Sequence, residues 1–337
     1  MAADAAFDPV RQPWPDQEIV ASTPAEGAGR GLLEETVITP QLKQWHAMGQ
    51  MRQLGAHAMF CVDSGERDRP AMLLIHGFPT ASWDWHKVWA PLHQHYRLLT
   101  WDMLGFGFSA KPNPHRYSIH EQADLAEAFL SSAGVQQCHV VAHDYGDTVA
   151  QELLARQNES SAWQCLSMTF LNGGLFPETH RALVTQRLLL SPLGPFINAL
   201  AGRRQFDRAM TRVFGANTPP SASELDNFWA LIQHNNGKHL FHNLITYMRD
   251  RKQHRERWVQ ALQRSALPLG LINGSTDPVS GAHMVARYKE LSCRLDYLTQ
   301  LPEVGHYPQV EDPNSVAQAV LGFLSSLDHS GAAPSVA

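Results

Sequence analysis

The sequence contains few cysteines and no pair of them close together. Its 337 residues include only Cys61, Cys138, Cys165 and Cys293, which are widely spaced and form no C-x-x-C pair. Cys61 and Cys138 lie in apolar, strand-like runs, which favours buried free thiols in a reducing compartment over disulfide bonds. We therefore expect no disulfide framework.

Long apolar segments are also absent. The longest, LLLSPLGPFINALAG, is interrupted by Pro192, Pro195 and Asn198 and is too short to span a bilayer. The first ten residues show neither the basic nor the apolar region of a signal peptide. The sequence therefore predicts a cytoplasmic protein without a membrane span.

The chain has no excess of positive charge. Its formal net charge is −5 and its pI is about 6.4, so the balance favours neither nucleic acid nor an anionic membrane surface as a partner. Basic residues gather only in RDRKQHRERW, residues 249–258, where Asp250 and Glu256 alternate with them. Such alternation is typical of a solvated helix face.

What the sequence does contain is an alternation of short apolar runs with helical patterns. Ser118 and Glu121 fit a capping box at the start of a helix over 118–134. The alternation predicts an α/β protein with a mostly parallel sheet covered by helices. The predicted strands cover residues 71–78, 96–103, 138–144, 166–174, 267–274 and 293–301.

Three segments interrupt or flank this pattern. Residues 175–264 are Leu-rich and helix-like without a buried strand, which predicts a helical cap inserted between core segments 41–174 and 265–328. Residues 1–40 and 329–337 lack periodicity, so we expect a flexible extension and a flexible tail. In an open parallel sheet the ligand site lies at the carboxyl ends of the strands, where the insertion would form a lid.

The stretch AHDYG, residues 142–146, marks one such strand end. Small residues two positions on either side of Asp144 suit a tight strand-to-helix elbow, the turn that carries a serine nucleophile in G-x-S-x-G enzymes. The alternative is a helix N-cap, a common role for Asp that Asp147 would fill equally well. The stretch alone does not separate these two interpretations.

Other strand ends favour the nucleophile. Asp277 in LINGSTDPVSG and His306 in LPEVGHYPQVEDP follow Asp144 in the chain order nucleophile, acid, histidine. The turn His76-Gly77-Phe78-Pro79 ends an earlier strand. There the backbone N–H of Phe78, together with that of Tyr145, would stabilise a developing negative charge.

These motifs resemble the α/β-hydrolase superfamily, in its epoxide hydrolase and haloalkane dehalogenase branch. The resemblance covers roughly residues 45–325 and rests on LGFGFSAKP, HRYSI, AHDYGDTVAQELL, NGGLFPETHR and GHYPQVEDP. It implies an α/β-hydrolase fold with a mostly parallel eight-stranded sheet, a helical cap, and no metal or organic cofactor.

An aspartate in the nucleophile position changes the expected chemistry. A carboxylate is already ionised at neutral pH but reacts poorly with esters and amides. It can displace a leaving group from an sp³ carbon and form an alkyl ester. His306, oriented by Asp277, would then activate the water that hydrolyses this ester. The expected partner is a small apolar organic substrate, an epoxide or an alkyl halide.

The leaving group separates these two substrates. Resembling enzymes protonate an opening epoxide with cap tyrosines, whereas they bind a departing halide with a Trp beside the nucleophile and an Asn or second Trp. Here Tyr145 replaces the Trp and Phe78 replaces the Asn at two of those halide-binding positions. These replacements favour epoxides over alkyl halides as substrates. Tyr247 is the predicted proton donor, with a buried core tyrosine as the alternative. The second donor is not evident, and His180 is a candidate.

The remaining expectations concern the pocket and the assembly. The residues predicted to bind substrate are His76, Pro79, His180 and Trp83. Core packing is the alternative for Trp83, which lies in the cluster SWDWHKVW. We expect a monomer or a homodimer. A dehalogenase and a non-catalytic protein that binds a small ligand stay open as alternative functions.

Overall fold

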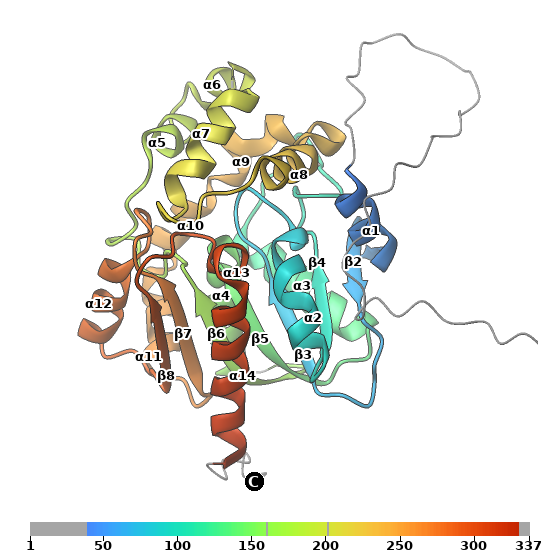
Figure 1. Ribbon diagram of the computed structural model, residues 1–337, viewed down its shortest axis with the longest axis vertical. Helices are drawn as coiled ribbons and strands as arrows, with labels where there is room; N and C mark the ends of the chain where they lie inside the picture. The colour runs from blue at the N-terminus through green and yellow to red at the C-terminus, as the bar shows by residue number, and fades with distance from the viewer. Residues whose placement is uncertain (1–38, 160, 201, 330–337) are drawn as a thin grey trace, which may run out of the picture.

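The computed structural model describes residues 39–159, 161–200 and 202–329 (Figure 1). Apart from residues 39, 40 and 329, the predicted flexible extension and tail lie outside the described residues. All four cysteines are buried and free, as predicted.

An eight-stranded sheet forms the centre of the molecule, in the order β1-β2-β4-β3-β5-β6-β7-β8. The pairs β1–β2 and β2–β4 are antiparallel, and every later pair is parallel. The predicted mostly parallel sheet flanked by helices is confirmed. The strands are β1 (Gly49–Leu54), β2 (His57–Asp63), β3 (Ala71–Ile75), β4 (Arg97–Trp101), β5 (Gln137–His143), β6 (Gln164–Leu171), β7 (Leu269–Gly274) and β8 (Tyr297–Leu301).

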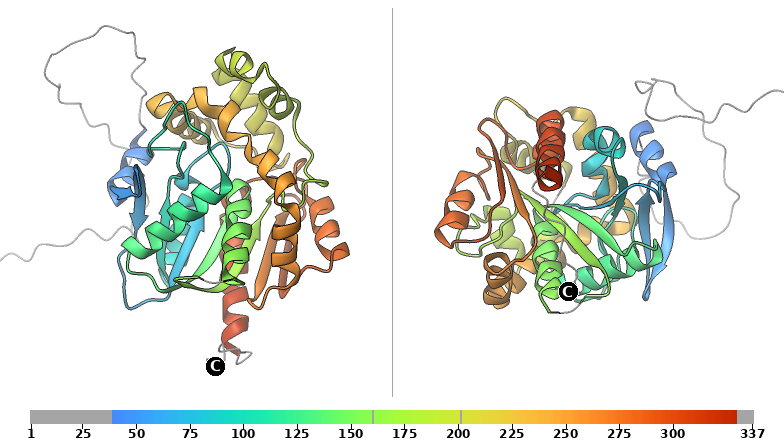
Figure 2. Two further views of the ribbon diagram at one scale, coloured as in Figure 1. Left: turned by 180° about the vertical axis from the view of Figure 1, so that it is seen from behind. Right: turned by 90° about the horizontal axis from the view of Figure 1, so that it is seen from below.

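Alternate side chains of the central strands enter two separate cores, because successive residues of a strand point to opposite faces. In β3, Leu73 and Ile75 belong to one apolar cluster, while Met72 and Leu74 belong to the other. Helices α3 (Ile119–Ser132), α4 (Tyr145–Gln157) and α11 (Arg255–Gln263) cover the first face, and α2 (His86–His93) and α14 (Pro313–His329) cover the second (Figure 2). The sheet is thus buried on both sides, which explains its almost continuous apolar runs.

The chain between β6 and β7 contains helices and, among its described residues, no strand. Residues 184–253 of this helical insertion (175–264) lie over the carboxyl ends of the parallel strands, whereas α11 packs against α4 beside the sheet (Figure 1). Its α-helices are α5 (Val184–Leu189), α6 (Gly194–Leu200), α7 (Arg203–Val213), α8 (Ala222–Gln233), α9 (Phe241–Leu244), α10 (Tyr247–Gln253) and the α11 already given, with the 3₁₀ helix η2 (His234–Leu240) between α8 and α9.

The remaining helices lie outside the insertion. They are α1 (Pro40–Met48), the 3₁₀ helix η1 (Ser82–Trp85), α12 (Ala282–Glu290) and α13 (Pro308–Glu311). Within the described part of the chain, none of the helices combines the length and the apolar character needed to cross a membrane.

Candidate active site

The carboxyl ends of the parallel strands bring the predicted nucleophile, acid and histidine together. Asp144 directly follows β5, Asp277 lies three residues after β7, and His306 lies five residues after β8. Because these strands run in the same direction, their ends meet at one edge of the sheet. All three side chains are buried there, at 5% exposure or less.

Asp144 sits on a sharp turn and has an unusual backbone conformation. Its φ is 47° and its ψ is −104°, in a region that non-glycine residues seldom adopt. Gly146 permits the turn because a Cβ there would lie 2.5 Å from the Ile75 carbonyl oxygen. The elbow predicted from the small residues around Asp144 therefore has a steric cause, and it holds the Asp144 side chain at the end of the strand.

The Asp144 carboxylate does not cap the helix that follows it. Although Asp144 occupies the N-cap position of α4, its side chain accepts no capping hydrogen bond. Instead, Oδ2 accepts a hydrogen bond of 3.1 Å from the Phe78 backbone N–H. Asp147 is likewise no cap, since its Oδ1 accepts from the Leu171 N–H. The local sequence could not separate these roles, but the hydrogen bonds do.

His306 links the two aspartates. Its Nδ1–H donates to Asp277 Oδ2 at 2.8 Å, and its Nε2 lies 3.8 Å from Asp144 Oδ1. Asp277 also accepts from the N–H groups of Val279 and Ser280, at 2.8 and 3.1 Å. A carboxylate held by this many donors keeps the imidazole in a fixed orientation, with Nε2 directed toward Asp144.

Asn172 completes this support, although the sequence did not single it out. It follows β6 with a φ of 44°, and its Nδ2 donates to Asp277 Oδ2 at 3.0 Å. Its Oδ1 accepts from the Gly274 N–H, which ties β6 to β7. The signal in the sequence was its place in LNGG, near the carboxyl end of the strand predicted over 166–174, where a polar side chain reaches the site.

The charges of the three groups depend on one another. Burial raises the pKa of the Asp144 carboxyl, but the neighbouring His306 and Arg251 more than offset this and hold it well below its usual value. Burial lowers the pKa of His306, and Asp277 and Asp144 raise it well above the usual value for histidine. In the resting site the geometry therefore favours a carboxylate facing an imidazolium.

A cavity of about 140 Å³ opens onto Asp144 and His306. Its walls are mainly apolar and come from the core and from the helical insertion. The core contributes Phe78, Pro79, Val279 and Tyr307. The insertion contributes residues of α5 and α7, together with Trp229, Lys238 and Phe241. Such a pocket suits a small apolar molecule that reacts at one end.

On the insertion side, Tyr247 and Arg251 lie four residues apart on α10 and therefore share one face of the helix. The Arg251 guanidinium lies over the Tyr247 ring, 4.6 Å from its centroid. Its Nη2–H donates to the Asp144 carbonyl oxygen at 3.2 Å and lies 3.9 Å from Asp144 Oδ1. The Tyr247 hydroxyl is buried without a hydrogen-bond partner in the described part of the structure.

Comparison with known proteins agrees with this geometry. The family model described as the α/β hydrolase fold matches residues 70–313. This chain belongs to the α/β-hydrolase family. It is 41% identical over 299 residues to the mesoderm-specific transcript homolog protein of Bos taurus, covering 86% of this chain and 89% of that protein. It is 37% identical over 287 residues to the putative hydrolase LipZ of Mycobacterium tuberculosis, covering 85% and 99%.

Solved structures share the fold of this α/β hydrolase. The haloalkane dehalogenase DbeA of Bradyrhizobium elkani superimposes with a TM-score of 0.71 at 21% identity, covering 84% of this chain and 99% of that one. The predicted resemblance to the α/β-hydrolase superfamily, and to mesoderm-specific transcript protein in particular, is confirmed.

Three of the four residues predicted to bind substrate lie outside the cavity lining of this hydrolase, namely His76, His180 and Trp83. His76 is fully buried behind the Phe78 turn, where its Nε2 accepts from the Met103 N–H and its Nδ1–H donates to the Gly77 carbonyl. Burial lowers the pKa of His76 to about 3, so the ring is neutral. Trp83 stacks on His86 and packs against Phe228 in the core, which was the alternative for this residue. The side chains of His76 and Trp83 are structural.

The other predicted site residues are placed as follows. Pro79 lines the cavity, whereas His180 and Tyr247 lie outside its lining. His180 is bound to the Arg251 guanidinium through Nδ1 at 3.3 Å, and burial lowers its pKa to about 4. Tyr145 packs against Tyr247 with ring centroids 4.7 Å apart. Of the two predicted oxyanion donors, only the Phe78 N–H makes a hydrogen bond to Asp144 within the described chain.

The basic run RDRKQHRERW is not simply a solvated face, so that expectation was wrong in part. Arg251 is only 2% exposed and donates to the Asp144 carbonyl oxygen. Arg255 pairs with Glu178, and Arg257 pairs with Glu152 and Glu159. The i, i+4 spacing from the predicted donor Tyr247 was the signal that could have identified Arg251.

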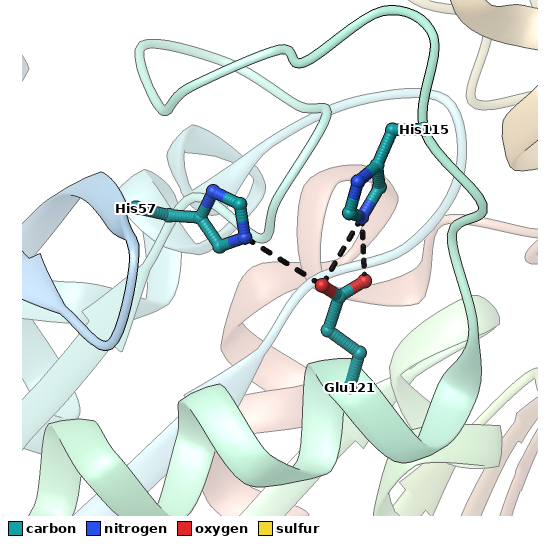
Figure 3. Close-up of side chains that lie close together, drawn as sticks. All are labelled: His57, His115 and Glu121. Atoms are coloured by element: carbon teal, nitrogen blue, oxygen red, sulfur yellow. Dashed lines mark hydrogen bonds and ion pairs between the residues drawn. The ribbon is translucent and has the colours of Figure 1, made fainter.

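One group of possible metal ligands stands apart from this site. His57, His115 and Glu121 lie close together, on a strand, a loop and the first turn of α3 (Figure 3). His115 Nε2 lies 2.8 Å from Glu121 Oε2, and His57 Nε2 lies 3.6 Å from Oε1. None of the three lines the cavity. Their contacts with one another account for their positions.

Proposed function

We propose that this α/β hydrolase opens epoxides by forming a covalent ester at Asp144. Asp144 Oδ1 attacks an sp³ carbon of the ring, the carbon–oxygen bond breaks, and the ring oxygen leaves as an alkoxide that takes up a proton. Water then hydrolyses the hydroxyalkyl ester to a vicinal diol and regenerates the carboxylate. No cofactor takes part, and the substrate is a small apolar molecule that fits the cavity.

The hydrogen bond from the Phe78 N–H to Asp144 Oδ2 carries this proposal. It leaves Oδ1 as the attacking atom and keeps Oδ2 on a donor when Oδ2 becomes the carbonyl oxygen of the ester. Attack of water on that ester makes Oδ2 an oxyanion, and a donor already in place stabilises the charge without rearrangement. In the proposal the Tyr145 N–H is the second donor, recruited when the ester forms.

His306 acts in the second step. Its Nε2 removes a proton from water, and Asp277 stabilises the resulting imidazolium. The charges support this order of events. Conversion of Asp144 to an ester removes one of the two negative charges that raise the pKa of His306, the other being that of Asp277, and so favours release of the imidazolium proton to solvent before water is activated.

Tyr247 and Arg251 support an epoxide as the substrate. Tyr247 has an unpartnered hydroxyl beside Tyr145, so it is the proposed proton donor to the alkoxide. The second tyrosine expected from the resemblance is missing. We assign its place to Arg251, whose buried positive charge adjoins Asp144 and stabilises negative charge on the departing oxygen.

Mass spectrometry of a stalled intermediate tests this function. We expect the His306→Gln variant to accumulate a covalent adduct on Asp144 when it is incubated with a panel of epoxides and haloalkanes. An epoxide adds its whole mass to the protein, whereas a haloalkane adds its mass less that of the hydrogen halide. The Asp144→Ala, His306→Gln double variant serves as the control and should form no adduct.

The outcomes separate the alternatives. Adducts from haloalkanes alone would replace the epoxide proposal with a dehalogenase. Tight binding of panel members without any adduct, in the variant and in the wild type, would support a non-catalytic binding protein.

A further inference from the structure

Exposed apolar side chains of the described chain gather on the helical insertion. Seven large ones are at least 36% exposed, and two of these, Met48 and Met51, lie on α1 and β1. The other five are 44–70% exposed and lie on α5, on α6 and between them: Val184, Leu188, Leu193, Phe196 and Leu200. Figure 1 shows α5 and α6 at the end of the molecule opposite the C-terminal end of α14.

Positive charge gathers on the same part of the chain. Residues 181–213 contain six arginines and one acidic residue, Asp207. The whole insertion carries 13 Lys and Arg against 6 Asp and Glu, a net charge of +7, whereas the rest of the chain carries 14 against 26, a net charge of −12. The overall charge of −5 conceals this division. For that reason, composition alone did not indicate that the protein binds an anionic surface. Arg187, Arg204, Arg208 and Arg212 are exposed.

This surface is continuous with the wall of the cavity. Helix α5 exposes Val184 and Leu188, while Leu189 of the same helix lines the cavity. Helix α7 exposes Arg204 and Arg208, while Phe206 of that helix lines the cavity. The two helices therefore separate the apolar pocket from an outer surface that is apolar and basic.

We propose that α5, α6 and α7 dock this protein on an anionic lipid bilayer. The five apolar side chains enter the boundary between headgroups and acyl chains, and the arginines bind lipid phosphates. A second copy of the chain is the poorer fit, because a symmetric pairing of this surface would bring its arginines together. Docked in this way, the helices that wall the cavity contact the phase in which apolar substrates dissolve.

Vesicle flotation with the full chain tests the docking without any substrate. We expect the protein to float with vesicles of phosphatidylcholine and phosphatidylglycerol, to float far less with phosphatidylcholine alone, and to detach as salt is raised. The Leu193→Asp, Phe196→Asp double variant should bind at least about 10-fold more weakly. Removing the charge of Arg204 or Arg208 by substitution with Gln should weaken binding about 5-fold each.

The chain provides a matched control. Met48→Asp, Met51→Asp removes the other exposed apolar pair and should leave vesicle binding unchanged. Thermal unfolding of every variant verifies that the fold is intact. Hydrogen exchange of the wild type on anionic vesicles should be slowed in peptides from residues 184–212.

Several results would overturn the proposal. The first is that the protein does not float with anionic vesicles. The second is that the Met48→Asp, Met51→Asp control loses as much vesicle binding as the Leu193→Asp, Phe196→Asp variant. The third is that vesicles slow hydrogen exchange only in α1 and β1. Dimers that the Phe196 substitution abolishes, without vesicle binding, would assign the surface to a second copy. Because no turnover is measured, failure of the docking leaves the aspartyl-ester proposal intact, and failure of that chemistry leaves the docking intact.

Discussion

The two halves of the candidate site differ in how fully their polar groups are bound. On the core side, Asp277 accepts hydrogen bonds from His306, Asn172, Val279 and Ser280. On the insertion side, the Tyr247 hydroxyl and the His180 Nε2 have no partner in the described residues. Buried polar groups are nearly always hydrogen-bonded in folded proteins. The acid and the histidine are therefore held in place at rest, although the hydroxyl of Tyr145, also on the core side, has no partner among the described residues. In the proposed mechanism, the free Tyr247 hydroxyl is the group that donates to the substrate oxygen.

The largest effect should come from the core half. We predict that Asp144→Ala lowers kcat for epoxide hydrolysis by at least about 10⁴-fold, because no other carboxylate can form the ester. Steady-state kinetics with a chromogenic epoxide measures this. The matched control is Asp147→Asn, a substitution of similar shape at a buried carboxyl whose pKa burial raises well above its usual value. If the control loses as much activity as Asp144→Ala, the loss reflects disruption of α4 and not the nucleophile.

On the insertion side the largest effect should belong to Tyr247. We predict that Tyr247→Phe lowers kcat on epoxides about 100-fold, because the alkoxide loses its proton donor, and leaves binding of the apolar substrate nearly unchanged. The comparison variant is Tyr145→Phe, which removes the neighbouring unpartnered hydroxyl but keeps the backbone N–H. If Tyr145→Phe lowers kcat more than Tyr247→Phe does, Tyr145 and not Tyr247 is the proton donor.

The pH dependence should differ between the two steps. Ester hydrolysis needs a neutral His306, so its rate should rise about 10-fold per pH unit below the pKa of His306 in the ester and then level off. Ester formation needs the Asp144 carboxylate, whose pKa is held low, and the protonated Tyr247 hydroxyl, whose pKa burial raises, so its rate should stay flat over that range. Rapid-quench single turnovers measure both rates. A hydrolysis rate independent of pH would exclude His306 as the base.

The smallest effect is expected outside the two halves. Trp83→Phe should change kcat and KM by no more than about 2-fold, because Trp83 packs against His86 and Phe228 and not against the cavity. It should nevertheless lower the thermal unfolding temperature, since a buried ring loses contacts. A change in KM with an unchanged unfolding temperature would show that Trp83 contacts the substrate, as the sequence analysis predicted.

The sequence predicted the core side far better than the insertion side. Buried parallel strands are continuous apolar runs, so six of the eight strands and the residues at their ends could be found by pattern. Strand β1 was not delimited, because five of its six residues are exposed or half-buried in no alternating pattern. The positions of Asp144, Asp277 and His306 followed from their order along the chain.

The insertion side depends on tertiary contacts that local patterns do not encode. A basic run on a helix is usually solvated, and nothing within RDRKQHRERW shows that Arg251 alone turns inward against Thr148 and Asp144. His76 was misassigned for a related reason. The turn after β3 directs the backbone of Phe78 at Asp144 and turns the imidazole of His76 back toward Met103.

One measurement tests the central claim most directly. A single turnover of the wild type in heavy-oxygen water, followed by mass analysis of the peptide that contains Asp144, reports whether that carboxylate was ever an ester. The proposed mechanism predicts that heavy oxygen enters the Asp144 carboxylate, because water attacks its carbonyl carbon and not the substrate. Product that carries the label while the Asp144 peptide stays unlabelled would contradict the proposal, since water would then have attacked the substrate itself.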